Sequence, residues 1–200
     1  MVALIILFWA MVLIILYTYI GFPVMLWVRA KLSPQPFQSD TNHKPSVSFI
    51  VCAYNEEDVI LDKVNNLIAL DYPADKLEII VASDGSSDKT NEIVKANPHP
   101  QVRLLELPRG GKNQTLNSAV AEAQSDVLVF TDADTLLKPD ALTYLVAPFV
   151  DETVGGVSGD FHYRKSSAEG TESERTYWSI DRMLKQLQTD GGSMTSASGQ

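Results

Sequence analysis

The chain has 200 residues, 45% of them hydrophobic, and carries a formal net charge of −9 at neutral pH. This length supports one domain with a substantial hydrophobic core. The negative charge argues against binding to a long nucleic acid, which needs a basic surface. It does not exclude a small anionic ligand, because a bound metal ion supplies positive charge locally. The single cysteine, Cys52, excludes an intrachain disulfide and fits a reducing compartment.

The chain opens with a long apolar segment. Residues 2–28 contain no charged side chain, and as a helix they would measure about 40 Å at 1.5 Å per residue. The hydrocarbon layer of a membrane is roughly 30 Å thick, so we predict a transmembrane helix over residues 1–28, bent at Pro23. A cleaved signal peptide fits less well, because the apolar core is too long and no basic segment precedes it. Arg29 and Lys31 follow the span, which places the rest of the chain in the cytoplasm.

Residues 29–46 have the proline, serine and asparagine content of a linker. Beyond the linker, apolar runs that indicate strands alternate with segments of helical periodicity. The expected strands cover residues 47–53, 77–82, 102–107, 126–131 and 154–161. The expected helices cover residues 56–70, 87–96 (capped by Ser86 or Ser87), 112–123, 138–150 and 169–189. This alternation predicts an α/β domain with a mostly parallel sheet and helices on both faces.

Polar motifs follow the first two predicted strands. In a parallel sheet the carboxyl ends of the strands meet at one edge, and ligands bind there. Tyr54 offers an aromatic face to a base, and Glu56 offers a carboxylate to its polar edge. Asp84 can accept a hydrogen bond from a base N–H or a ribose hydroxyl, and Gly85 allows close approach of the backbone.

The next two strand ends carry groups suited to phosphate and metal. Gly110 and Gly111 lead into a helix whose N-terminus favours anions, and Lys112 in its first turn suits a phosphate oxygen. Asp132 and Asp134 are two carboxylates that can hold Mg²⁺ or Mn²⁺, which in turn holds a diphosphate. Each motif alone is compatible with a turn, a helix start or a solvated lysine. Together at one sheet edge, they predict a site for a nucleotide diphosphate.

These motifs resemble those of family 2 glycosyltransferases with the GT-A fold, of the membrane-bound type that makes cellulose, chitin and hyaluronan. The matching segments are residues 47–57, 80–88, 110–117 and 130–134. The resemblance implies a metal-dependent, inverting transfer of sugar from a nucleotide diphosphate sugar, usually a UDP-sugar, to a saccharide or lipid-linked acceptor. It also implies a place in the inner or plasma membrane of a bacterium, in the synthesis of envelope polysaccharide.

The resemblance assigns roles to particular residues. Asp132 and Asp134 would bind the metal, with Asp134 the more direct ligand. Many members have an aspartate where this chain has Ser83. The nucleotide-sugar-binding residues that it implies are Ala53, Tyr54, Glu56, Asp84, Lys112 and Asp132.

The family also has a Glu-Asp or similar motif downstream of the metal site, which supplies the general base, and a Gln-x-x-Arg-Trp motif further on; neither pattern occurs in this sequence after Asp134. We therefore expect the base beyond Gln200, and we expect residues 47–200 to be a donor-binding domain truncated at its C-terminus.

Two alternatives stay open at this point. Without a base, the chain would act as a membrane-tethered nucleotide-sugar binder or a regulatory fragment. Phosphatases of the haloacid dehalogenase type also use Asp-x-Asp, with a threonine or valine two places after the second aspartate. This chain has Leu136 there, and three predicted strands precede a motif that in those enzymes ends the first strand.

Overall fold

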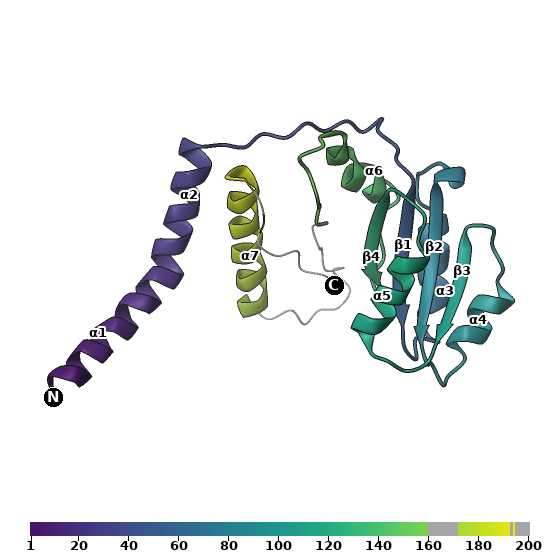
Figure 1. Ribbon diagram of the computed structural model, residues 1–200, viewed down its shortest axis with the longest axis horizontal. Coiled ribbons are helices and arrows are strands. Elements are labelled where there is room, and N and C mark those ends of the chain that lie inside the picture. Colours follow the sequence, from purple (N-terminus) through teal and green to yellow (C-terminus); the bar gives the residue numbers. More distant parts are fainter. Residues whose placement is uncertain (160–171, 193, 195–200) are drawn as a thin grey trace. The chain divides into compact units, whose positions relative to one another are not determined.

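The structure is a computed structural model that describes residues 1–159, 172–192 and 194 (Figure 1). The chain divides into two compact units. Among the described residues, the first unit contains residues 1–37 together with residues 172–192 and 194, and the second contains residues 38–159. The domain boundaries expected from the sequence stay a prediction.

In the first unit, the apolar segment forms a continuous helix from Val2 to Leu32. It consists of α1 (Val2–Leu16), the π-helical turn η1 (Tyr17–Gly21) and α2 (Phe22–Leu32). The π-turn lies just before Pro23, the position where a helix loses a backbone donor. The whole helix, Val2–Leu32, is long enough to cross a membrane and contains an 18-residue stretch with a mean hydropathy of 2.6. A signal sequence near an N-terminus would have the same two properties.

The same unit contains α7 (Glu172–Asp190), which packs against α2. The Nε of Arg29 in the last turn of α2 donates to the carbonyl oxygen of Gly191 at 2.8 Å. The apolar side chains of α7 are only partly covered, because Ile180 and Met183 are about half-exposed. The side chains of two further apolar residues of this helix lie outside the described part: Tyr177 and Trp178.

The second unit is built on a four-stranded parallel sheet with the strand order β3-β2-β1-β4. Its strands are β1 (Val47–Ala53), β2 (Leu77–Asp84), β3 (Val102–Leu107) and β4 (Val127–Asp132). The predicted parallel α/β sheet is thereby confirmed, with these strands at their expected places. Because β4 lies on the other side of β1 from β2, the strand order reverses at β1, where such sheets bind ligands.

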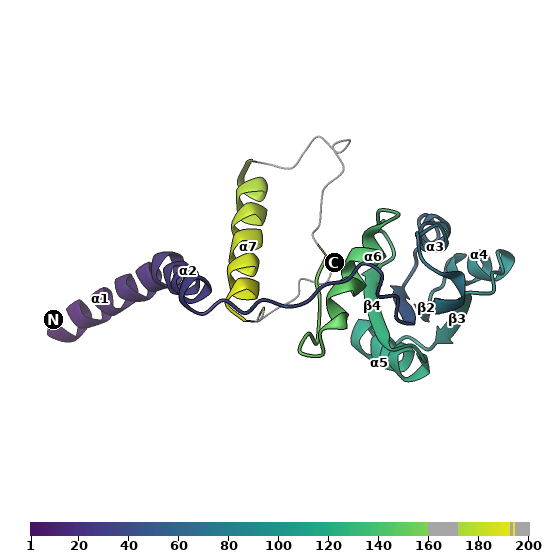
Figure 2. The same ribbon diagram turned by 90° about the horizontal axis from the view of Figure 1, so that it is seen from above.

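Helices cover both faces of this sheet. In Figure 2, α3 (Ile60–Ile68) and α4 (Thr90–Ala96) lie on one face, and α5 (Lys112–Glu122) lies on the other. Alternate residues of β1 serve the two layers, as the period of a strand requires. Val47, Phe49 and Val51 pack on the α3 face, and Ile50 packs on the α5 face.

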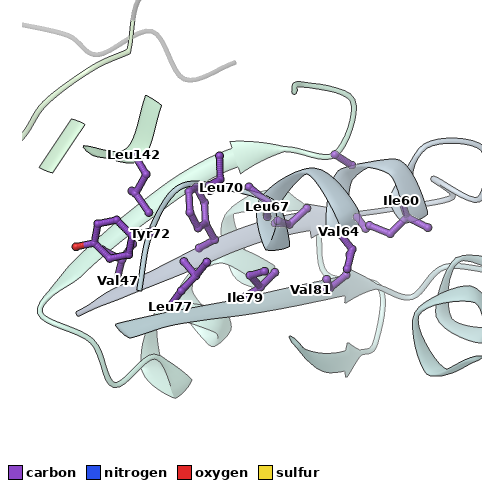
Figure 3. Close-up of a cluster of buried hydrophobic side chains, with 14 of the residues drawn as sticks. Val47, Ile60, Val64, Leu67, Leu70, Tyr72, Leu77, Ile79, Val81 and Leu142 are labelled. Carbon is purple, nitrogen blue, oxygen red and sulfur yellow. The ribbon is translucent and has the colours of Figure 1, made fainter. Parts of the chain in front are cut away.

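The α3 face holds the larger hydrophobic core (Figure 3). Leu142 and Val146 of the short helix α6 (Ala141–Val146) close one end of this core. Side chains from α3 and β2 form its centre: Ile60, Val64, Leu67, Leu77, Ile79 and Val81. This packing fixes the strands whose carboxyl ends carry the polar motifs.

Helices α3 and α4 begin later than the sequence predicts, and at both starts loop side chains accept from the backbone N–H groups. Helix α3 begins at Ile60 instead of residue 56. The N–H of Glu56 donates to Thr90 Oγ1 at 2.8 Å, and the N–H of Glu57 donates to Asp88 Oδ2 at 3.1 Å. Helix α4 begins at Thr90 instead of residue 87. Its first N–H donates to Asp88 Oδ1 at 3.0 Å, so the expected capping by Ser86 or Ser87 is wrong.

Beyond β4 the expected elements change most. The helix expected over residues 138–150 is α6 followed by a 3₁₀ turn, η3 (Ala147–Val150), that contains Pro148. Residues 154–159 form no strand, and residues 160–161 of that expectation lie outside the described part. Three of these six positions are glycines, which weaken a strand because they offer no side chain to pack.

Candidate functional site

A pocket of about 370 Å³ opens at the carboxyl ends of the strands, on the edge predicted for ligand binding. The strand register brings its parts together, because Ala53 lies opposite Ser83, and Cys52 lies opposite Asp132. All the residues that the sequence assigned to nucleotide-sugar and metal lie in its lining. The lining residues are Cys52, Ala53, Tyr54, Glu56, Asp84, Arg109, Lys112, Asp132, Ala133 and Asp134.

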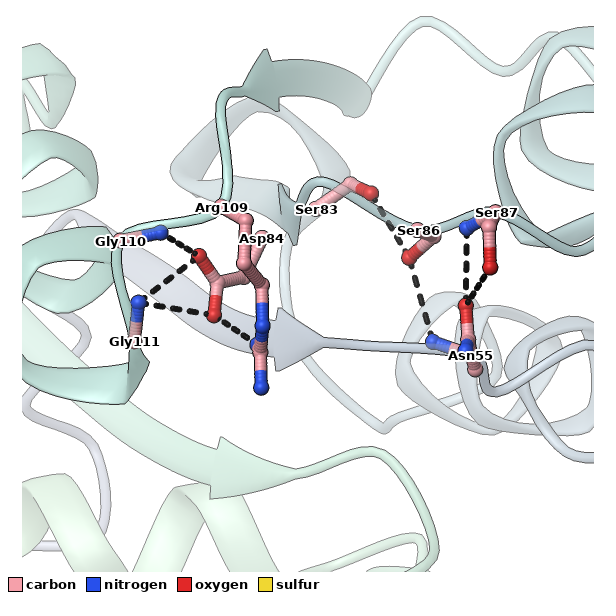
Figure 4. Close-up of polar contacts among 8 residues, drawn as sticks. All are labelled: Asn55, Ser83, Asp84, Ser86, Ser87, Arg109, Gly110 and Gly111. Carbon is pink, nitrogen blue, oxygen red and sulfur yellow. Dashed lines mark hydrogen bonds and ion pairs between the residues drawn. The ribbon is translucent and has the colours of Figure 1, made fainter.

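Asp84 is the most enclosed carboxylate of the pocket, with 3% of its surface exposed. Its Oδ1 accepts from the N–H of Gly110 at 2.7 Å and from that of Gly111 at 3.0 Å, and Oδ2 pairs with Arg109 (Figure 4). Although burial opposes the shift, the Gly110 N–H foremost, the Gly111 N–H and Arg109 hold the pKa of Asp84 below its usual value. From the sequence we expect this helix start to bind a phosphate, but in the structure the N–H groups of Gly110 and Gly111 donate to Asp84.

Gly85 makes this arrangement possible. Its φ of +64° is unfavourable for a residue with a side chain, and a Cβ there would lie 2.7 Å from the Arg109 backbone nitrogen. The sequence predicts close backbone approach at Gly85, and the approaching backbone is that of the loop between β3 and α5. Gly111 also has a positive φ, +85°, but its missing Cβ would meet no neighbouring atom within 4 Å.

Arg109 is a pocket residue that the sequence reading missed. Its guanidinium carbon lies 3.5 Å from the centroid of the Tyr54 ring, a cation–π contact, while the same guanidinium pairs with Asp84. A flat group with N–H donors thus occupies both the aromatic face and the acceptor that the sequence assigns to a base. The available signal was a basic residue directly before the two glycines.

Loop-to-loop hydrogen bonds hold the residues after β1 against those after β2. Asn55, at φ +56°, accepts at Oδ1 from the N–H of Ser87 at 2.8 Å, and its own N–H donates to Ser86 Oγ at 3.2 Å. The hydroxyl of Ser83 donates to Ser86 Oγ at 2.9 Å (Figure 4). Ser83, which stands where many family members have an aspartate, is therefore part of the scaffold that positions Tyr54.

The end of β4 carries the two carboxylates predicted to bind metal. Lys112 Nζ pairs with Asp132 Oδ1 at 2.7 Å, and this hydrogen bond raises the pKa of the lysine. Burial, and then the negative charge of Asp134, raises the pKa of Glu56. These two carboxylates therefore repel one another electrostatically across the pocket. Burial raises the pKa of the Cys52 thiol to about 11, so the thiol is neutral at pH 7.

The lining has an excess of negative charge, with four carboxylates against Arg109 and Lys112. A diphosphate would be repelled unless a divalent cation enters with it. Among residues 1–159, 172–192 and 194, no cluster of three or more His, Cys, Asp or Glu side chains is placed to hold a metal. Asp132 and Asp134 fit an ion such as Mg²⁺, which takes one or two carboxylates and completes its shell with substrate phosphates and water.

Comparison with known proteins gives a consistent picture. Residues 48–200 match the family Glycosyl transferase family 2. The poly-beta-1,6-N-acetyl-D-glucosamine synthase of Staphylococcus aureus strain MSSA476 is 33% identical over 176 residues, which cover 86% of this chain and 42% of that protein. The synthase of the same name from Staphylococcus epidermidis is 33% identical over 167 residues, which cover 81% of this chain and 40% of that protein. This chain therefore spans about two fifths of the length of these relatives.

Among solved structures, the mannosyltransferase PcManGT from Pyrobaculum calidifontis, in complex with GDP-Man and Mn²⁺, is similar with a TM-score of 0.63. It is 35% identical, and the match covers 73% of this chain and 45% of that one. The family match extends over more than half of the chain and includes all four strand-end motifs. The chain belongs to glycosyl transferase family 2.

Proposed function

We propose that this chain is the donor-binding part of a membrane-anchored glycosyltransferase. It binds a UDP-sugar with Mg²⁺ or Mn²⁺, and the enzyme transfers the sugar, with inversion, to a saccharide or lipid-linked acceptor. The observation that carries the proposal is the pocket itself, where an aromatic face, an enclosed carboxylate, a lysine and a pair of carboxylates converge. The family membership supports this reading and disfavours the phosphatase alternative.

The nucleoside takes the place that Arg109 holds in the structure. A base stacks on Tyr54, and its N–H donates to Asp84 Oδ2, the atom that pairs with Arg109. The guanidinium is a physical stand-in for the base, because it is flat and presents N–H donors to the same two partners. Ala53 and Glu56 line the pocket beside Tyr54 and contact the polar edge of the nucleoside.

The diphosphate lies between Lys112 and the metal. The Lys112 ammonium, already aligned by Asp132, donates to a phosphate oxygen. Asp134 and Asp132 hold the divalent cation, which neutralises charge on the leaving diphosphate when bound. The acceptor hydroxyl also needs a base, and we place it outside this pocket because the pocket carboxylates already serve the nucleoside and the metal.

The position of the basic residues sets the proposed topology. Arg29 and Lys31 lie in the last turn of α2, at the end of the apolar helix. Positive charge at one end of a span favours the cytoplasmic side for that end. We therefore place the donor pocket on the cytoplasmic face of a bacterial membrane.

Nucleotide binding tests the proposal. The full chain in detergent micelles is titrated calorimetrically with UDP, UDP-GlcNAc and GDP-mannose in the presence of Mn²⁺. UDP-GlcNAc is a primary test because the curated relatives are named as N-acetylglucosamine polymer synthases. We expect saturable binding of UDP and UDP-GlcNAc, and weaker binding of GDP-mannose.

A double variant locates the binding site. Asp84→Ala with Asp134→Ala should abolish binding. The matched control, Asp62→Ala with Asp75→Ala, removes two exposed carboxylates outside the pocket and should leave the affinity unchanged. Unchanged UDP affinity in the Asp84 and Asp134 double variant would refute the site, and tighter binding of GDP-mannose would refute the choice of UDP.

A further inference from the structure

Lys63 is a charged residue in the hydrophobic core. It lies on α3, on the same buried face as Ile60, Val64 and Leu67, and none of its surface is exposed. Burial of an ammonium group is strongly unfavourable unless it is hydrogen-bonded and close to negative charge. Its place in the core therefore needs an explanation that the pocket residues do not give.

The contacts of Lys63 supply that explanation. Its Nζ donates to Thr131 Oγ1 at 2.7 Å and also to the carbonyl oxygen of Thr135. Thr131 directly precedes Asp132, and Thr135 directly follows Asp134. One ammonium group thus ties together the two ends of the short turn that carries both carboxylates.

The turn is also anchored between its carboxylates. Ala133 is buried in the core on the α3 face, so the backbone between Asp132 and Asp134 is fixed on one side. Burial lowers the pKa of Lys63 to about 8, while the negative charges of Asp132 and Asp134 act to raise it. The ammonium therefore lies within electrostatic range of both carboxylates and reduces the repulsion between them.

We propose that Lys63 is a positioning residue for the metal. By tying Thr131 to Thr135, it holds Asp132 and Asp134 at the spacing that a divalent cation and a diphosphate need. Lys63 is not part of the pocket lining, so it acts through the turn and does not touch the nucleotide. The inference rests on the proposed function, because it presumes that the nucleotide binds with a metal.

The rival explanation is that Lys63 only ties α3 to β4. The variant Lys63→Met distinguishes the positioning role from this structural role, because methionine has a similar length and suits an apolar core but carries no charge. The change also leaves the hydroxyl of Thr131 and the carbonyl oxygen of Thr135 without the donor that Lys63 supplies, so it should lower the stability of the fold as well. A purely structural role predicts that any loss affects all ligands equally. A positioning role predicts a loss confined to the metal-dependent part of the affinity.

The metal-dependent part of the UDP affinity is measured in the full chain in detergent. UDP is titrated with Mn²⁺ and again with EDTA, and the ratio of the two affinities gives the coupling between metal and nucleotide. Uridine, which has no phosphate, reports on the nucleoside subsite alone. We expect Lys63→Met to reduce the coupling about 10- to 100-fold, the usual effect of losing a partner that orients metal ligands. Uridine affinity should stay within about twofold.

Two further variants complete the test. Lys95→Met removes a lysine that pairs with Glu106 outside the pocket lining, with 57% of its side chain exposed, and should leave the coupling unchanged. Thr131→Val removes one acceptor of the Lys63 ammonium and should reduce the coupling by a smaller factor. In the double variant with Lys63→Met, Thr131→Val should cost little more, because both changes remove the same hydrogen bond.

The outcomes separate this inference from the proposed function. If the unaltered chain binds UDP equally with Mn²⁺ and with EDTA, both are overturned. If the unaltered chain shows the coupling and Lys63→Met keeps it, or loses uridine affinity in the same proportion, only the role of Lys63 is overturned. Thermal unfolding monitors the fold, and if Lys63→Met does not fold, the coupling measured in Thr131→Val decides.

Discussion

Replacing Tyr54 by alanine tests how the pocket exchanges its own guanidinium for a base. In the structure Tyr54 is 42% exposed as a residue, and the Arg109 guanidinium lies over its ring, 3.5 Å from the centroid. Stacking of a base on an aromatic side chain is worth about 1–3 kcal/mol by alanine substitution. A cation–π contact at an exposed site is worth about 0.5–1 kcal/mol, and the base must replace it.

The net value of the ring is the difference, centred on about 1 kcal/mol. Tyr54→Ala should therefore weaken uridine binding roughly fivefold. If Arg109 is first replaced by alanine, no cation has to leave the ring and the full stacking energy appears. The same change should then cost about 2 kcal/mol, or roughly 30-fold.

Calorimetric titration of uridine into the four proteins of this cycle measures both effects without a phosphate charge that would interact with Arg109. Tyr144→Ala, which removes an exposed tyrosine on α6, is the matched control and should not change the affinity. The reasoning is refuted if Tyr54→Ala has no effect. It is also refuted if the effect is smaller in the Arg109→Ala background, because ring and guanidinium would then hold the base together.

Three further predictions concern the phosphate contact, the core and the acid response. Lys112→Gln should weaken UDP binding in Mn²⁺ about tenfold or more, because a hydrogen bond to a charged group is worth about 1.5–3 kcal/mol, and an equal loss of uridine affinity in titration would contradict the assignment. Leu67→Ala, in the core, should lower the free energy of unfolding, measured in urea, by about 2–5 kcal/mol. Leu61→Ala, which is exposed on the same helix, should lower it by less than about 1 kcal/mol. Similar losses for the two variants would contradict the placement of Leu67 in the core. Hydrogen bonds from Ser46 lower the pKa of Asp126, so the stability that they provide is present above the ordinary pKa of about 4 and is lost as the pH falls below it. Ser46→Ala should therefore unfold more easily than the unaltered chain at pH 7, and urea titrations should show the difference shrink below pH 4; a difference that grows in acid would contradict this.

The sequence predicts the sheet well because its strands are short apolar runs bounded by turn residues. The strand-end rule then gathers Tyr54, Asp84, Lys112 and Asp132 without any knowledge of tertiary contacts. Helix starts are predicted less well. The N–H groups after β1 donate to Thr90 and Asp88 across a loop, and periodicity along the chain gives no sign of these contacts.

Long-range partners account for what the sequence reading misses in the site. Lys63 reads as an interruption of an apolar stripe, and its acceptors lie about 70 residues further along the chain. The sequence predicts that Asp84 contacts a ligand, but in the structure its hydrogen-bond donors come from the loop after β3. Arg109 carries no motif of its own, and it enters the pocket because Gly85 leaves room for its backbone. In each case, folding decides which partner a polar group meets.

The most direct test of the central claim is the dependence of UDP affinity on Mn²⁺ in the full chain. The pocket carries more negative than positive side chains, and two of its carboxylates, Asp132 and Asp134, have the chemistry to take a divalent cation. We predict that UDP binds at least tenfold more tightly with Mn²⁺ than with EDTA, and that Asp134→Ala removes this difference. Equal affinity with Mn²⁺ and with EDTA, or a gain that survives Asp134→Ala, would contradict the account.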